Sequence, residues 1–315
     1  MMKKILLSIL VIIFGMLGEL PAFAADYDIY VDKDNKSGIE DGSASHPYNT
    51  IAEGIAAALA NGKNHRKIYA ASGEYKEQII VGKYVKLYGK NKNRTIINGG
   101  NNKYAVKMKD HSTIKDVRVY KGKTGILIDE NAKVKIKNCK IRSSKKIGIE
   151  ILKSNRNDSE KATIKDSKIY KSDGKGLYIK KGKVELIDNK ICDNDEEGID
   201  LRAKVRGKIK NNEIYDNGES GIEVIVGKAD LKISRNEIKN NRASAISTQF
   251  YPEDSVTGDI KIEENGLARS EKYGIDCGNP SGGHYGLNYW NDSIFLSGNT
   301  YFGNKLGNYS SICRF

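Results

Sequence analysis

The chain has 315 residues and a formal net charge of +13, and hydrophobic residues make up 38% of it. This charge says more about binding partners and solubility than about the fold. The four histidines and four cysteines show no spacing typical of zinc ligands, so the sequence gives no support to a zinc site.

The first 24 residues have the pattern of a secretory signal peptide. Lys3 and Lys4 precede an apolar run over residues 5–17, and small residues at Ala22 and Ala24 end the segment. The run is too short to span a bilayer comfortably, although an uncleaved anchor is the alternative. No later stretch is apolar enough to cross a membrane. We therefore expect a secreted or periplasmic protein without a transmembrane segment after signal cleavage.

The charge of an exported protein predicts a particular kind of partner. An acidic polysaccharide or an anionic polymer of the cell surface fits better than nucleic acid, because nucleic acid is not the usual partner outside the cytoplasm. The alternative is that the lysines only reflect a general preference for this residue at the surface. The charge alone leaves both interpretations open.

Residues 25–110 are expected to form the entrance to a larger structure. Residues 27–31 alternate as a strand does, and residues 50–59 have helical spacing, with Thr50 and Glu53 placed as a capping box. Exposed strand edges tend to pair with other chains. We therefore expect this helix to cover one end of the structure that follows.

From about residue 114 to residue 277 the chain repeats one pattern every 22 to 29 residues. Apolar and polar residues alternate within each copy, which indicates strands. The first column of the repeat is Ile114, Ile136, Ile164, Leu186, Ile209, Ile233 and Ile262. The second is Gly125-Ile126, Gly148-Ile149, Gly176-Leu177, Gly198-Ile199, Gly221-Ile222, Ala245-Ile246 and Gly274-Ile275. The third is Val117, Cys139, Ser167, Asn189, Asn212, Asn236 and Asn265.

A repeat made of short strands cannot bury its apolar face alone, so its copies must stack into a solenoid. Stacked asparagines can then hydrogen-bond along the axis, as amide ladders do in fibrils. A leucine-rich repeat is the main competing solenoid. Its Leu-x-x-Leu-x-Leu pattern and its helical half are both missing from this chain.

These columns resemble the right-handed parallel β-helix repeats of the pectate-lyase-like superfamily, over roughly residues 26–277. The resemblance implies an all-β, right-handed parallel β-helix with an N-terminal capping helix and an irregular C-terminal cap. We expect one domain over residues 25–315, with a cap and first rungs at 25–110, regular repeats at 111–277 and the C-terminal cap at 278–315. The catalytic signatures of pectinesterases are absent, so esterase activity is not inferred.

The residue after each Ile or Leu of the second column is expected to point outward. This outward column reads Leu127, Glu150, Tyr178, Asp200, Glu223, Ser247 and Asp276. Asp200 and Glu223 fall on adjacent rungs, about 5 Å apart, with Arg202 and Lys180 beside them. Close carboxylates repel each other, and a hard cation such as Ca²⁺ would relieve that repulsion.

In the superfamily this strand lines the substrate groove, where calcium and a basic residue act in polysaccharide lyases. The resemblance implies Asp200 and Glu223 as calcium ligands and Arg202 or Lys180 as the catalytic base. Glu150 and Tyr178 continue the same face as candidate ligand contacts. The alternative is a solvated strand face whose carboxylates form weak surface ion pairs with Arg202 and Lys180.

A second candidate site is a basic ladder. Six consecutive rungs carry Arg118, Lys140, Lys168, Lys190, Glu213 and Glu237 at the same position. Like charges at strand spacing cost stability unless an anionic partner or salt screens them. The first four residues are therefore candidate contacts for a polyanion. The alternative is that lysines on a β-surface discourage aggregation.

The cysteines are expected to differ in state. Cys277 and Cys313 flank the irregular C-terminal segment and are predicted to form a disulfide. Cys139 and Cys192 lie two rungs apart in different columns. At about 4.8 Å per rung, they are separated by at least roughly 10 Å, which is too far for a disulfide. We expect them to be buried free thiols.

The preferred functional hypothesis is a protein that binds polysaccharide, of acidic type, at or outside the cell surface. The competing hypothesis is a calcium-dependent polysaccharide lyase or a related uronate-acting enzyme. A third is a structural or adhesive surface protein. The expected fold serves all three, so the choice depends on the site.

Overall fold

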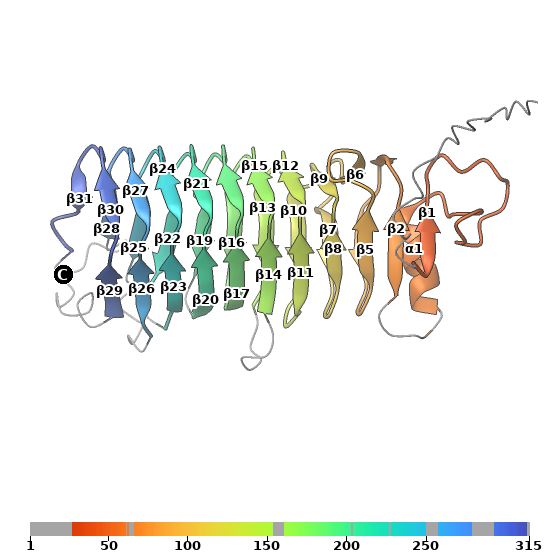
Figure 1. Cartoon of the computed structure of the whole chain (residues 1–315), viewed down its shortest axis with the longest axis horizontal. Helices are drawn as coiled ribbons and strands as arrows, with labels where there is room; N and C mark the ends of the chain where they lie inside the picture. The colour runs from red at the N-terminus through yellow and green to blue at the C-terminus, as the bar shows by residue number, and fades with distance from the viewer. Residues whose placement is uncertain are drawn as a thin grey trace, which may run out of the picture.

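The chain winds into a parallel β-helix, in which three parallel sheets run along the length of the molecule (Figure 1). The computed structural model describes residues 27–60, 62, 66–153, 161–202, 204–226, 228–249, 258–278 and 293–313. After β1, each coil contributes one strand to each sheet in turn, so strands three apart in sequence are neighbours in space. The all-β solenoid predicted from the repeat is confirmed.

The three sheets are named A, B and C in the order in which the chain visits them. Sheet A contains β1 (Ile29–Val31), β2 (Lys67–Ala70), β5 (Lys86–Gly89), β8 (Thr113–Lys115), β11 (Val134–Lys137), β14 (Lys161–Lys165), β17 (Gly182–Ile187), β20 (Val205–Lys210), β23 (Asp230–Ser234), β26 (Ile260–Glu263) and β29 (Ile294–Ser297). Sheet B contains β3 (Gly73–Tyr75), β6 (Thr95–Asn98), β9 (Arg118–Tyr120), β12 (Lys140–Arg142), β15 (Lys168–Tyr170), β18 (Lys190–Cys192), β21 (Glu213–Tyr215), β24 (Glu237–Lys239), β27 (Gly266–Ala268) and β30 (Thr300–Phe302). Sheet C contains β4 (Ile79–Val81), β7 (Tyr104–Met108), β10 (Thr124–Ile128), β13 (Ile147–Ile151), β16 (Lys175–Ile179), β19 (Ile199–Leu201), β22 (Ile222–Ile225), β25 (Ile246–Gln249), β28 (Tyr273–Gly278) and β31 (Gly307–Tyr309).

The first column of the repeat forms a continuous apolar line inside the coil. Its members pair in register, as Ile136 does with Ile164 and Ile164 with Leu186, and each is fully buried. Complete burial of one such side chain stabilises the fold by roughly 1.5–3 kcal/mol. The glycine of the second column is required by close approach between coils, because a Cβ at Gly176 would lie 2.5 Å from the carbonyl oxygen of Gly198.

The predicted asparagine column forms a hydrogen-bonded ladder. The Nδ2 of Asn189 donates to Oδ1 of Asn212 at 3.0 Å, and the same bond links Asn212 to Asn236, Asn236 to Asn265 and Asn265 to Asn299 at 2.9 Å each. Each buried amide therefore has a partner on the next rung. These bonds fix the register of the coils, since a shifted coil would leave buried amides unpaired.

A second ladder was not anticipated. Asn194 donates to Asn217 at 2.9 Å, and Asn217 donates to Asn241 at 3.0 Å. These residues follow the first ladder at a constant offset of five positions, so the signal was present in the repeat. The two ladders bracket sheet B at its two corners.

The N-terminal end is covered as predicted by the helix α1 (Ile51–Ala60), which lies beside β1 and β2 in Figure 1. The capping box is present, because Thr50 N–H donates to Glu53 at 3.0 Å and Glu53 N–H donates to the Thr50 hydroxyl at 3.2 Å. Glu77 accepts from two further N–H groups of the first turn. The helix buries an apolar face that includes Ile55, and so closes this end of the core.

The regular coil extends beyond residue 277, where the sequence suggested only an irregular cap. β29, β30 and β31 add one further strand to each sheet, with Leu296 paired to Ile262. The spacing from Asn265 to Asn299 is 34 residues, and this long insertion hid the last copy from the repeat pattern. Cys277 and Cys313, the pair expected to be bridged, form a disulfide with a Cα separation of 5.2 Å.

Cys139 and Cys192 are buried free thiols, as expected. Within the described ranges, no helix is long and apolar enough to cross a membrane. The expected signal peptide of residues 1–24 lies outside the described residues. Two copies of the repeat exceed the basic period, and most of their extra residues, near 153–161 and 250–259, also lie outside them.

Candidate functional site

Sheet C carries the outward column predicted from the sequence, and its register is confirmed. Neighbouring strands place its seven members side by side in the order Leu127, Glu150, Tyr178, Asp200, Glu223, Ser247 and Asp276. Asp200 on β19 is thus directly beside Glu223 on β22. The proposed roles of these residues remain predictions.

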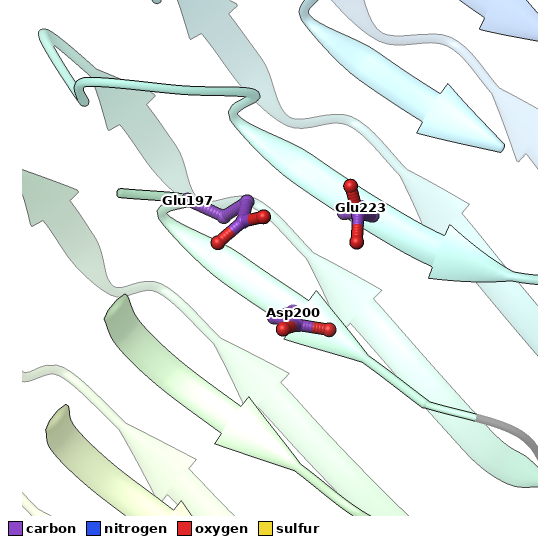
Figure 2. A group of neighbouring side chains, drawn as sticks. All are labelled: Glu197, Asp200 and Glu223. Carbon is purple, nitrogen blue, oxygen red and sulfur yellow. The ribbon is translucent and has the colours of Figure 1, made fainter. Parts of the chain in front are cut away.

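Three carboxylates meet at this point of the column. Figure 2 shows Asp200, Glu223 and Glu197, the last from the turn that leads into β19, on the same side of the sheet. One carboxylate oxygen of each lies within 4.8 Å of the others. All three residues are buried. Sequence reasoning found two of the three.

The alternative of a solvated strand face does not hold at Asp200, because its residue surface is 0% exposed. Its position does face away from the core, but Lys175 and Arg202 lie against its carboxylate. The alternative of weak surface ion pairs is also wrong for this pair of carboxylates, since Glu223 is only 8% exposed. Substitutions at Asp200 therefore affect packing as well as chemistry.

Two cations neutralise part of the cluster. The Nζ of Lys175 lies 2.5 Å from Oε2 of Glu197 and 3.0 Å from Oδ2 of Asp200. Arg202 lies 2.8 Å from Oδ2 of Asp200 and 3.7 Å from Oε1 of Glu223. Three buried carboxylates therefore share two cations. Burial makes the remaining negative charge costly.

This imbalance shifts the pKa values of the carboxyls. Burial, followed by the charges of Glu197 and Asp200, raises the pKa of Glu223 to about 7. Burial also raises the pKa of Asp200, against the opposing charges of Lys175 and Arg202. Burial acts in the same direction on Glu197, but hydrogen bonds with Lys175 and Glu219 and the charge of Lys175 together outweigh it and lower the pKa. The cluster thus places an ionised carboxylate beside a carboxyl that titrates near neutral pH.

Glu219 and Gln249 extend the cluster. A hydrogen bond with Glu197, reinforced by burial, raises the pKa of Glu219 to about 7. The Nε2 of Gln249 donates to Oε2 of Glu223 at 2.5 Å. Both residues line a groove of about 390 Å³, whose wall also includes Glu223, Arg242, Ser247, Lys272 and Asp276.

The donor set of the cluster fits a hard divalent cation in part. Ca²⁺ binds oxygen ligands at about 2.3–2.6 Å, so three oxygens within 4.8 Å of one another can contact one ion. The Oδ1 of Asp200 is buried and has no hydrogen-bond partner among the described residues, which leaves one acceptor available. Lys175 and Arg202 oppose the binding of a cation at this site, because their positive charges already lie against Oδ2 of the same carboxylate.

Both candidate bases are engaged in ion pairs. The Nζ of Lys180 lies 2.8 Å from Oε1 of Glu150, and Arg202 contacts Asp200. The two cations also lie over the ring of Tyr178, at 5.8 Å and 5.6 Å from its centroid. Glu150, Tyr178 and Lys180 thus form a group next to the cluster. Both candidate bases therefore already have carboxylate partners.

The basic ladder lies on sheet B, away from this column. Its six members pair in the predicted order Arg118, Lys140, Lys168, Lys190, Glu213 and Glu237. Lys190 forms an ion pair with Glu213 at 2.8 Å. The ladder is therefore a separate surface, and its fourth member already has an anionic partner.

Sequence reasoning missed Lys175, Glu197 and Glu219. Lys175 and Glu197 each directly precede the glycine of the second column, in adjacent copies of the repeat. The position before each glycine was not considered, although it recurs with the same spacing as the glycines themselves. Glu219 enters through the reach of its side chain, for which the repeat gives no signal, whereas Gln249 lies in the same column of the repeat as Arg202.

The sequence and the fold can be compared with those of known proteins. Residues 104–311 match the family described as the right handed beta helix region. No curated protein matches the chain.

Several solved structures share the fold at low sequence identity. Pectate lyase Pel9A has a TM-score of 0.60 at 15% identity, over 90% of this chain and 78% of that one. The A-module of the mannuronan C-5 epimerase AlgE4 from Azotobacter vinelandii has a TM-score of 0.52 at 16% identity, over 89% and 97%. Pectin methylesterase from carrot has a TM-score of 0.52 at 12% identity, over 92% and 88%. At these identities the likeness establishes the fold alone. With the family match over more than half of its length, the chain belongs to the right-handed β-helix family.

Proposed function

We propose that this chain binds a polysaccharide, of acidic type, in the groove beside Glu223. The lining of the groove carries the proposal. Arg242, Gln249 and Lys272 bring hydrogen-bond donors, and Glu223 and Asp276 bring acceptors. Sugar hydroxyls both donate and accept hydrogen bonds, so this mixed lining suits a hydroxyl-rich ligand better than an apolar one.

Charge and fold support the acidic type. Arg242 and Lys272 can form charge-assisted hydrogen bonds with the carboxylate of a uronate residue. The fold is shared with a pectate lyase, a mannuronan epimerase and a pectin methylesterase, whose names state polysaccharide substrates. The signal peptide expected in residues 1–24 would place the protein at or outside the cell surface.

The test measures binding of the purified protein to polygalacturonate, alginate and neutral dextran by titration calorimetry. We expect binding to the two acidic polymers, and at least fivefold weaker binding after Arg242→Ala or Gln249→Ala. Lys232→Ala is the control, because Lys232 lies on sheet A in an ion pair with Glu263. Failure to bind any of the three polymers, or unchanged binding by both groove variants, would contradict the proposal.

A second candidate function is a calcium-dependent, uronate-acting enzyme. The observation that favours it is the buried Oδ1 of Asp200, which has no hydrogen-bond partner among the described residues and belongs to a cluster whose three carboxylates can contact one ion. Glu197, Asp200 and Glu223 would hold the ion. Calcium, when bound, would supply the positive charge that acidifies the proton next to a uronate carboxylate.

Two readouts decide between the candidates. An enzyme of this kind should release unsaturated, ultraviolet-absorbing ends from a uronate polymer only with calcium present, and Asp200→Asn should abolish that release. A binder should retain the polymer without releasing such ends. Calcium titration of chelator-treated protein tests the ion separately. Absence of both calcium binding and turnover would reject the enzyme, and absence of any glycan binding as well would favour a structural or adhesive protein.

A further inference from the structure

Sheet B presents basic and aromatic side chains together on three consecutive strands, β9, β12 and β15. The middle residue of each strand is buried and the two outer ones are partly exposed. The outer positions, in register across the strands, are Arg118, Lys140 and Lys168 on one side and Tyr120, Arg142 and Tyr170 on the other. These six residues are called the basic strip below.

Arg142 lies at the centre of the basic strip, between two tyrosines. The carbon of its guanidinium is 5.4 Å from the ring centroid of Tyr120 and 5.5 Å from that of Tyr170. Lys168 lies 4.6 Å from the Tyr170 centroid, and Lys121 lies 5.0 Å from the Tyr120 centroid. Contact with the rings orients these cations without neutralising them.

The other cations of the strip contact neutral groups. Arg118 donates to the carbonyl oxygen of Asn93 at 3.0 Å, and Lys140 donates to Oδ1 of the same residue at 2.6 Å. The Nε of Arg142 donates to the hydroxyl of Ser143 at 3.3 Å. Within the described part of the chain, none of the four cations of the strip forms an ion pair with a carboxylate. The strip therefore keeps its positive charge for an external anion.

The positive charges of the strip lie close enough together to affect the pKa of Lys140. Partial burial, followed by the neighbouring charges of Arg118, Lys92 and Lys168, lowers its pKa. An anion bound to the strip would relieve this repulsion. The next rung ends the strip, because Lys190 is paired with Glu213.

A hollow of about 270 Å³ lies at the other end of the strip, lined by Glu74, Ile96, Arg118, Tyr120 and Arg142. The Nε of Arg118 is buried and has no hydrogen-bond partner among the described residues. Glu74 accepts a hydrogen bond from Asn98 at 2.5 Å and marks the limit of the positive surface. Arg118 thus lines this hollow together with the stacked guanidinium of Arg142.

We infer that the basic strip is a second binding surface, which holds a carboxylate-bearing polysaccharide along the axis of the β-helix. Rungs are about 4.8 Å apart, which is close to the length of one sugar ring in an extended chain, so successive carboxylates can meet successive cations. Nucleic acid fits less well, because the cations already cover the tyrosine rings on which bases would stack. The strip is on sheet B and the Glu223 groove on sheet C, so the two proposals stand independently.

The test uses polygalacturonate as the probe and is run in the Arg242→Ala background, which weakens the groove and leaves the strip unchanged. We expect the Lys140→Ala, Arg142→Ala double variant to bind at least tenfold more weakly at low salt. Added sodium chloride should steeply weaken polygalacturonate binding by the parent protein, since exposed charge pairs are screened. Arg142→Lys should recover only part of the loss, because lysine keeps the charge but not the planar donor fork.

Lys190→Ala is the matched control, because it removes a cation from the same column that is already paired with Glu213. We expect it to change affinity less than twofold. Thermal unfolding of every variant checks that the fold is intact. An unchanged affinity of the double variant, an equal loss in Lys190→Ala, or tighter binding of a single-stranded oligonucleotide than of polygalacturonate would each overturn the inference.

Discussion

Lys175 lies 3.0 Å from the carboxylate of Asp200, on the next strand of sheet C, and that carboxylate is fully buried. The same ammonium group contacts Glu197 at 2.5 Å. One cation thus holds together two carboxylates that would otherwise repel each other at low solvent exposure. The candidate site therefore depends on Lys175. This residue directly precedes Gly176 of the repeat, and it is not part of the outward column predicted from the sequence.

Removal of this cation should destabilise the protein. Lys175→Met leaves the Asp200 and Glu197 carboxylates short of one partner, and breaking a buried pair in this way costs roughly 3–5 kcal/mol. Urea unfolding at pH 7.5 measures the change. Lys232→Ala removes a lysine that is 49% exposed in its ion pair, so its effect should stay below about 1 kcal/mol. Similar midpoints for the two variants would show that Lys175 does not hold the cluster together.

The asparagine ladder should contribute more to stability than any exposed lysine of sheet A. Asn212→Leu removes a buried amide that bonds both Asn189 and Asn236, and each neighbour left without a partner costs about 1–3 kcal/mol. Lys208→Ala, on the exposed face of β20, should change stability by less than about 0.5 kcal/mol. Chemical denaturation compares the two. Equal denaturation midpoints would contradict the structural role of the ladder.

The coil was predictable from the sequence because equivalent positions on successive rungs have the same surroundings and therefore require the same type of side chain. Ile164 must be apolar and Asn212 must find an amide on each side, so the columns could be identified directly. The last coil was not predictable, because the 34-residue spacing between Asn265 and Asn299 breaks the period. The alternation of apolar and polar residues still indicates a strand at β29. The strand that pairs with it cannot be identified without the register that the repeat period supplies.

The candidate site was only partly predictable for a different reason. Strand alternation correctly placed Asp200 and Glu223 side by side and facing outward. It could not predict the burial of Asp200, which depends on where the long side chains of Lys175 and Arg202 lie. The repeat determines where the Cβ atoms lie, whereas exposure and pKa depend on side-chain conformations that the repeat does not specify.

The four cysteines should fall into two chemical classes. Cys277 and Cys313 are bridged, whereas burial raises the pKa of Cys139 to about 12 and that of Cys192 to about 11. Thiol titration should therefore detect two thiols after denaturation without reductant and four after reduction, and the native protein should react slowly. Loss of the bridge should cost about 3–4 kcal/mol on the chain-entropy estimate. A mapped bridge between Cys139 and Cys192 would overturn the rung register.

The stability of the protein should carry a pH dependence that belongs to Glu223. Its pKa is about 7 in the folded protein, above the ordinary value of 4.5, so the folded state binds more protons than the unfolded state between these values. Its contribution to stability is therefore fully present below about pH 4.5 and is lost as the pH rises through 7. Glu223→Gln removes this titration while its side-chain oxygen can still accept the hydrogen bond from Gln249.

Relative to the parent protein, Glu223→Gln should gain about 1–3 kcal/mol of stability between pH 5.5 and pH 8. Urea unfolding at both pH values measures the gain, and Glu237→Gln, at an exposed position on sheet B, serves as the control. The comparison with the parent isolates Glu223, because Glu219 titrates near the same pH in both proteins. A constant stability difference across this range would show that Glu223 is ionised throughout, and that burial does not raise its pKa in the folded protein.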